Sequence, residues 1–125
     1  MHRLGLLVLG TVLAAALAGC GATAAPATPQ APGEADVTIS SGSMEFDTNT
    51  LDVPAGRPFS ILYVNQSPMP HNVAIYADSS LSEKIFVGDL IGEGSVVYDV
   101  PAMPAGEYFF RCDVHPEMSG AVNSR

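Results

Sequence analysis

The sequence is poor in positive charge and in cysteine. Its 125 residues include 5 lysines and arginines against 13 aspartates and glutamates, which gives a formal net charge of −8. Binding to DNA or RNA phosphates needs clustered lysine and arginine, so this balance argues against a nucleic-acid partner. The length limits the chain to one domain. Only two cysteines are present, Cys20 and Cys112.

The apolar run at the N-terminus is too short to span a bilayer as a helix. It extends over fifteen uncharged residues, from Leu4 to Ala18, whereas a spanning helix needs roughly 20. The run follows the positively charged Arg3, and its length and flanks are typical of the apolar region of a secretory signal peptide. We therefore expect residues 1–19 to be a signal peptide.

The apolar run ends in the letters LAGC, which resemble the lipobox of bacterial lipoproteins. The resemblance implies that Cys20 carries lipid and anchors an exported protein to a membrane, facing the periplasm or the cell exterior. Cys112 would then have no disulfide partner in an oxidising compartment, where a free thiol needs to be buried or bound. The alternative is an ordinary signal peptide cut elsewhere, with Cys20 incidental.

After Cys20, the sequence GATAAPATPQAPGEA is almost wholly alanine, proline, threonine and glycine. It has no apolar periodicity and cannot form a core, so we expect residues 20–35 to be a spacer. The folded domain is expected over residues 36–125.

The domain is predicted to be all-β. Short apolar or alternating runs are separated by glycine and proline turn signals. A single helical turn over 78–84 is indicated only by the capping-box spacing of Ser80 and Glu83. Seven or eight short strands predict a β-sandwich or Greek-key barrel. The expected strands are 37–39, 44–47, 50–53, 59–64, 71–77, 95–100, 107–112 and a short run at 121–122.

The histidines of this domain lie in two distinctive motifs. His71 lies in the segment PMPHNV, and His115 lies in CDVHPEM, which begins at Cys112 and ends at Met118. Side chains alternate between the two faces of a strand. His71 therefore shares a face with Val73, and Cys112 shares one with Phe110. Since the apolar residues must point inward, the pattern directs His71 and Cys112 toward the same end of the core.

Two imidazoles, one thiolate and one thioether form a partly soft set of metal donors. Blue-copper centres use two histidines and one cysteine in a plane, with a distant axial methionine. Cys112, His115 and Met118 can come from one loop, so that only His71 arrives from elsewhere. Met69 and Met103 are alternative sources of a thioether. The sequence predicts one copper ion per chain.

Other metals explain this set less well. Structural zinc favours several cysteines or histidines and does not usually bind methionine. An iron site with two histidines and one carboxylate would leave Cys112 unused. Calcium needs more carboxylates than Asp113 and Glu117 provide. A dinuclear copper centre would need a second bridging thiolate.

The segment MPHNV and the loop Cys-x2-His-Pro-x-Met-x-Gly resemble the amicyanin and plastocyanin type of cupredoxin over roughly residues 36–122, and the short loop is most like amicyanin. The resemblance implies that His71, Cys112 and His115 are equatorial copper ligands and that Met118 is the weak axial one. It also implies that Asn72 ties the two ligand loops together. Electrons would pass through His115 and an apolar patch, with candidates Pro68, Met69, Pro70 and Pro116.

Two features set the chain apart from that family. The lipoprotein tether is one. The other is that only seven residues follow Met118, so we expect a short closing strand and leave its pairing open. The amine dehydrogenase that serves amicyanin is not implied, because partner choice depends on the surface and not on the ligands.

We expect a monomeric electron carrier that cycles Cu(II)/Cu(I) between redox partners outside the cytoplasm. The acidic surface would suit a basic c-type cytochrome, while a dehydrogenase or a terminal oxidase are further partners. No enzymatic activity is expected, because the chain lacks the extra histidines of a second copper centre. One alternative is a lipoprotein for copper buffering or delivery, although residues 21–35 lack methionine and histidine. Another is a fixed relay module in a respiratory complex.

Overall fold

The structure is a computed structural model that describes residues 34–125. The predicted signal peptide, Cys20 and the spacer up to residue 33 lie outside the described residues. Over 34–125 the chain forms eight strands and no helix, so the expected all-β sandwich is confirmed. None of these residues belongs to a helix long and apolar enough to cross a membrane.

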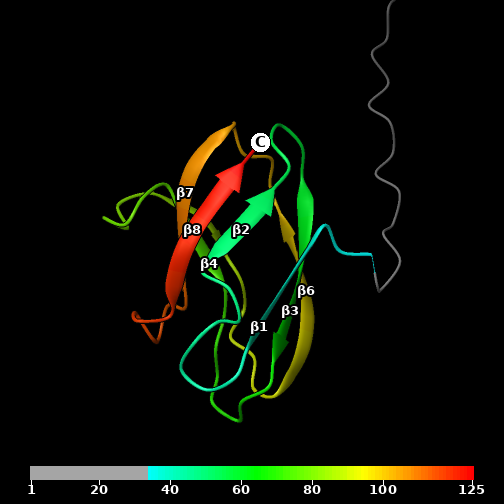
Figure 1. The fold of residues 1–125 in the computed structure, drawn as a ribbon, viewed down its shortest axis with the longest axis vertical. Coiled ribbons are helices and arrows are strands. Elements are labelled where there is room, and N and C mark those ends of the chain that lie inside the picture. Colours follow the sequence, from blue (N-terminus) through cyan, green and yellow to red (C-terminus); the bar gives the residue numbers. More distant parts are fainter. Residues whose placement is uncertain (1–33) are drawn as a thin grey trace, which may run out of the picture.

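The strands form two sheets that face each other (Figure 1). One sheet has the order β1-β3-β6, and the other has the order β2-β8-β7-β4-β5. Two pairs, β1 with β3 and β2 with β8, are parallel, and the other pairs are antiparallel. The strands are β1 (Val37–Ser41), β2 (Thr50–Val53), β3 (Phe59–Asn65), β4 (Ala74–Tyr76), β5 (Lys84–Val87), β6 (Gly94–Val100), β7 (Gly106–Arg111) and β8 (Ser119–Ser124).

The core fills the space between the sheets and includes several aromatic rings. Tyr63 is fully buried, stacks on Tyr98 with ring centroids 6.0 Å apart, and meets Phe46 edge to face at 6.3 Å. Its hydroxyl shares a hydrogen bond of 2.7 Å with Ser41, which satisfies both buried polar groups. The remaining core comes from inward-facing positions of both sheets and from two loop residues, Val73 and Met103. The sheet positions are Ile39, Leu51, Val53, Phe59, Ile61, Ile75, Val100, Phe110 and Val122.

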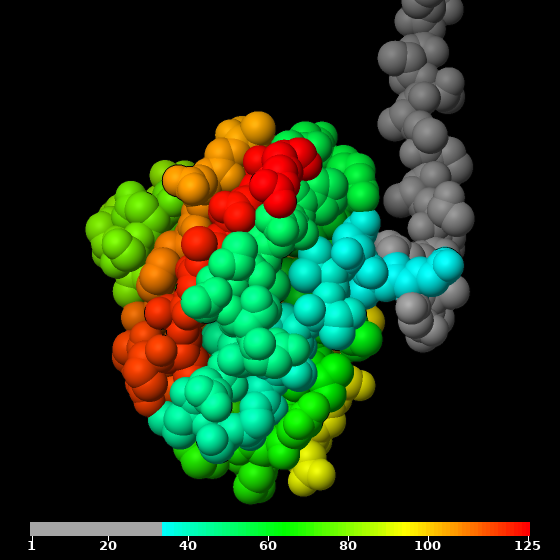
Figure 2. All heavy atoms as spheres, in the orientation of Figure 1, coloured from blue at the N-terminus to red at the C-terminus, as the bar shows by residue number. Residues whose placement is uncertain are grey.

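Four loops meet at one end of the sandwich, the lower end in Figures 1 and 2. They are residues 42–49, 66–73, 88–93 and 112–118. Asn65, at the end of β3, links two of them: its Nδ2 donates to the carbonyls of Met69 at 2.8 Å and Ile91 at 2.9 Å. The end of β3 therefore fixes where the loop before His71 lies.

The predicted strand 44–47 is wrong. This segment is a loop in which only Phe46 forms a single bridge, with Ser41. Ser40 closes the loop, since its amide donates to Asp47 Oδ1 and its carbonyl accepts from the Asp47 amide, both at 2.9 Å. Phe46 packs with its centroid 5.3 Å from that of Phe110, so its apolar character reflects core packing and not strand alternation.

The prediction for 71–77 holds only in its centre. β4 is limited to Ala74–Tyr76, and His71 pairs separately with Ile91. The helical turn predicted over 78–84 is also wrong, because Leu81 has a positive φ of 62°, which a right-handed helix does not allow. β5, Lys84–Val87, was not predicted as a strand.

The closing strand is longer than the two residues expected. β8 has six residues and pairs with β2 on one side and with β7 on the other, which answers the question of its pairing. Gly120 permits this close arrangement, because a Cβ atom there would collide with the carbonyl oxygen of Asn49.

Candidate metal centre

His71 is fixed through its backbone to the opposite loop. Its amide donates to Ile91 O at 3.1 Å, and the Ile91 amide donates back at 3.0 Å. The imidazole is fully buried, and its Nε2 has no hydrogen-bond partner. Burial lowers the pKa of His71, and the neighbouring His115 lowers it further. The Ser43 backbone has a smaller effect in the opposite direction. The ring is therefore neutral near pH 7, the form that binds a metal.

The loop 112–118 forms a compact turn closed by its own backbone. The Cys112 amide donates to Met118 O at 2.9 Å, and the Met118 amide donates to His115 O at 3.0 Å. Cys112 and Met118 are buried, whereas His115 is half-buried. Three of the predicted donor residues, Cys112, His115 and Met118, therefore lie in one short turn with no intervening element.

The structure brings His71, Cys112 and His115 together. Their donor atoms all lie within 4.8 Å of one another. Cys112 Sγ is 3.8 Å from His71 Nδ1 and 3.7 Å from His115 Nδ1. A metal–nitrogen bond of about 2.0 Å and a metal–sulfur bond of about 2.3 Å, meeting at about 120°, separate the nitrogen and sulfur atoms by about 3.7 Å. The two sulfur–nitrogen distances therefore fit a single metal ion that would be held by these three residues.

Burial and position distinguish the three methionines considered for the thioether. Met69 is 40% exposed, and Met103, although buried, accepts a hydrogen bond at its carbonyl from Gly56, in the turn between β2 and β3 at the opposite end of the sandwich. Met118 is buried within the loop that carries Cys112 and His115. Of the three, Met118 therefore fits the centre best.

Asn72 connects the surroundings of His71 to those of Cys112. Its Oδ1 accepts from the Asp113 amide at 2.9 Å, and its Nδ2 donates to Gly88 O at 2.9 Å. The side chain is buried. It therefore joins three loops next to the donor residues.

Apolar side chains are exposed in the loops around the half-buried His115. The sequence predicted the prolines and Met69, all of which are exposed. Sequence reasoning missed three further exposed residues of the loops at this end of the sandwich, although the apolar character of each is visible in the sequence. These are Met44 at 37%, Leu90 at 48% and Val114 at 48%.

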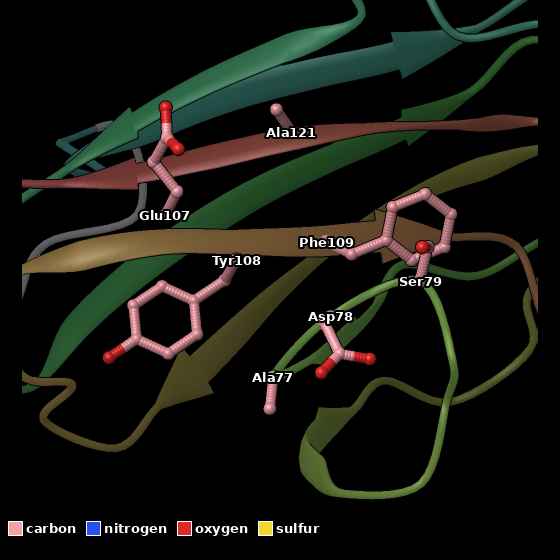
Figure 3. Close-up of a pocket in the computed structure, with 7 residues that line it drawn as sticks. All are labelled: Ala77, Asp78, Ser79, Glu107, Tyr108, Phe109 and Ala121. Carbon is pink, nitrogen blue, oxygen red and sulfur yellow. The ribbon is translucent and has the colours of Figure 1, made fainter.

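A separate cleft lies on the five-stranded sheet, beside the loop that follows β4 (Figure 3). None of the candidate donor residues lines it, so it does not belong to this centre. Its lining residues are Ala77, Asp78, Ser79, Glu107, Tyr108, Phe109 and Ala121.

Solved structures similar to this chain include amicyanins and auracyanins. Amicyanin from Paracoccus versutus is 30% identical with a TM-score of 0.58, over 75% of this chain and 84% of amicyanin. Auracyanin A from Chloroflexus aurantiacus, a "blue" copper protein, is 22% identical with a TM-score of 0.63. The match covers 70% of this chain and 96% of auracyanin A. Auracyanin from Roseiflexus castenholzii is 18% identical with a TM-score of 0.62, and the match covers 71% of this chain and 95% of that auracyanin. The auracyanins therefore show the fold alone.

No curated protein matches the sequence. A family model described as "Cupredoxin-like domain" matches residues 10–122, which is most of the chain. This match and the amicyanin likeness agree with the two-sheet fold and with the site at its loop end. The chain belongs to the cupredoxin-like domain family.

Proposed function

We propose that this protein is a type 1 copper electron carrier. The cofactor is one copper ion per chain. The observation that carries the proposal is the buried Cys112 thiol, with the Nδ1 atoms of His71 and His115 at 3.8 and 3.7 Å. These three residues and Met118 would hold the ion, a donor set that matches blue-copper centres.

A bound copper ion supplies one-electron chemistry by changing between Cu(II) and Cu(I). The protein supplies a thiolate at Cys112, which loses its proton on binding, and two neutral imidazoles. Burial of His71, Cys112 and Met118 excludes water, and Asn72 keeps the ligand loops in place. Donor atoms held in this way would need to move little when copper changes its charge. His115 is half-buried and would provide the path to the surface.

Redox partner proteins would dock at the loop end. Exposed carboxylates of Glu45, Asp89, Glu93 and Glu117 lie in the loops that carry the exposed apolar residues. None of these four loops contains lysine or arginine. This charge distribution favours a basic partner such as a c-type cytochrome, with association that weakens as salt increases. A dehydrogenase or a terminal oxidase with a basic docking surface would fit in the same way.

We further propose that the protein is an exported lipoprotein anchored through Cys20, facing the periplasm or the cell exterior. The resemblance of LAGC to a lipobox supports this location. On the same proposal the protein is a monomer that transforms no substrate itself.

The visible and EPR spectra of the Cu(II)-loaded protein test the function. We expect an intense blue band from sulfur-to-copper charge transfer and a narrow copper hyperfine splitting. A colourless protein with an ordinary tetragonal Cu(II) signal would contradict electron transfer and would favour copper buffering or delivery instead.

A further inference from the structure

The carboxylate of Asp113, the residue after Cys112, is held from two strands. The Tyr76 hydroxyl donates to Asp113 Oδ1 at 2.6 Å, and Arg111 Nε lies 3.8 Å from the same oxygen. Arg111 Nη2 also donates to the Asp113 carbonyl at 3.0 Å. With the amide bonded to Asn72, the side chain and both polar backbone groups of Asp113 have partners.

Tyr76 and Arg111 reach Asp113 from outside the sandwich. Ala74 of β4 pairs with Arg111 of β7, and Tyr76 is two residues beyond Ala74 on the same strand. Tyr76 and Arg111 therefore lie on one face of the sheet, opposite to the face on which Ile75 and its partner Phe110 enter the core. Their contacts with the ligand loop are thus separate from the core packing.

This network is well shielded from solvent. Tyr76 is 4% exposed, and the side chains of Arg111 and Asp113 are 17% and 27% exposed. A hydrogen bond to a charged group is stronger than one between neutral groups, and shielding strengthens it further. Burial, followed by the bond to Asp113, raises the pKa of Tyr76, so the hydroxyl stays protonated and able to donate near pH 7.

We propose that Asp113 is a positioning residue of the metal centre, whose side chain ties the start of the ligand loop to Tyr76 on β4. The inference rests on the proposed copper function. His71 precedes β4 by three residues and Cys112 immediately follows β7, so a tie between Tyr76 and Asp113 holds the two ligand-bearing segments at one spacing. Without it, the loop would open more often, and copper would leave faster.

The rate of copper release to excess EDTA measures this effect on the copper-loaded full chain. We expect Tyr76→Phe and Asp113→Ala each to release copper about tenfold faster, the scale of one charge-assisted hydrogen bond. The double variant should release it no faster than Asp113→Ala, because that substitution already removes the bond with Tyr76, together with the contacts of the carboxylate with Arg111 and Asn72. Asp113→Asn keeps an oxygen that accepts from Tyr76 and should release copper more slowly than Asp113→Ala.

Tyr108→Phe is the matched control. Tyr108 lies on the same sheet, beside the cleft of Figure 3, and its hydroxyl donates to Pro104 O at 2.9 Å, away from the ligand loop. We expect this variant to release copper at the wild-type rate. Equal release from Tyr76→Phe and Tyr108→Phe would overturn the proposal, as would effects of Tyr76→Phe and Asp113→Ala that multiply in the double variant.

Variant folding and metal-free stability serve as controls for the release rates. If Asp113→Ala does not fold, the comparison of Tyr76→Phe with Tyr108→Phe decides the matter alone. A purely structural bond would lower the unfolding midpoint of metal-free Tyr76→Phe without changing copper release, and that result would overturn the positioning role. A tetragonal EPR signal from the wild-type protein would contradict the electron-transfer function, whereas the release rates would still test the tie.

Discussion

At the scale of single residues, Cys112 determines what the centre can do, since its sulfur lies within 3.8 Å of a ring nitrogen of each imidazole. We expect Cys112→Ser to lose the blue band of the Cu(II) protein, because the sulfur-to-copper charge transfer disappears. An absorption spectrum measures the change, and a circular dichroism spectrum like that of the wild type would show that the fold remains. A persisting blue band would refute the thiolate assignment.

Met118 belongs to the same scale, because its burial in the ligand loop makes it the best placed of the methionines. We expect Met118→Leu to keep the blue colour and to raise the reduction potential, since a donor that stabilises Cu(II) is lost. The substitution nearly conserves volume, so it should cost less than about 1.5 kcal/mol of stability. Voltammetry measures the shift, with the exposed Met69→Leu as control. A shift in the control alone would assign the axial role to Met69.

Local sequence patterns predicted most of the strands but not all. The run 59–64 was recognisable because it is apolar on both faces, and it lies in the centre of its sheet as β3. β5 was missed because it is a short edge strand of half-buried and exposed residues with little alternation. Residues 44–47 misled because Phe46 packs into the core from a loop. Patterns over a few residues do not show such tertiary contacts.

The candidate site was predictable to a different degree. The donor residues could be found from their types and spacing, because three of them share one short loop. The bond between Tyr76 and Asp113 could not be found, since it joins residues 37 apart and depends on how β4 and β7 are paired. The sequence alone does not specify that pairing.

At the scale of one element, the position of β8 depends on Gly120. We expect Gly120→Ala to destabilise the fold by about 1–3 kcal/mol, because its Cβ would collide with the backbone carbonyl of Asn49, which cannot move like a flexible side chain. Urea unfolding measures the loss. The control is Gly42→Ala, where a Cβ meets nothing within 4 Å and the change should stay within about 0.5 kcal/mol. Equal midpoints for both variants would contradict the prediction.

At the scale of the whole molecule, buried tyrosines limit stability in alkali. Burial raises the pKa of Tyr63 and, more strongly, of Tyr98. Above pH 10 the unfolded chain loses these phenolic protons while the folded chain retains them. These tyrosines therefore contribute their full share to the free energy of unfolding below about pH 10. Above that pH the free energy of unfolding falls, by up to about 1.4 kcal/mol per pH unit for each group.

Urea unfolding at a series of pH values from 8 to 11 checks this alkaline loss of stability. We expect Tyr98→Phe to show a weaker dependence on pH than the wild type, because one of the shifted groups is removed. A midpoint that stays constant up to pH 11 would show that the folded and unfolded chains bind the same number of protons there, contrary to the prediction.

The pairing of β2 with β8 also determines the order in which the protein can form. Asp52 on β2 contacts Asn123 on β8 across 71 residues of chain. A chain that emerges from its N-terminus can therefore not complete the five-stranded sheet until residues 119–124 are free to pair, and contacts this distant in sequence make folding slow. The ligand loop immediately precedes β8, so the candidate metal centre takes shape only after most of residues 34–125 are free to pair.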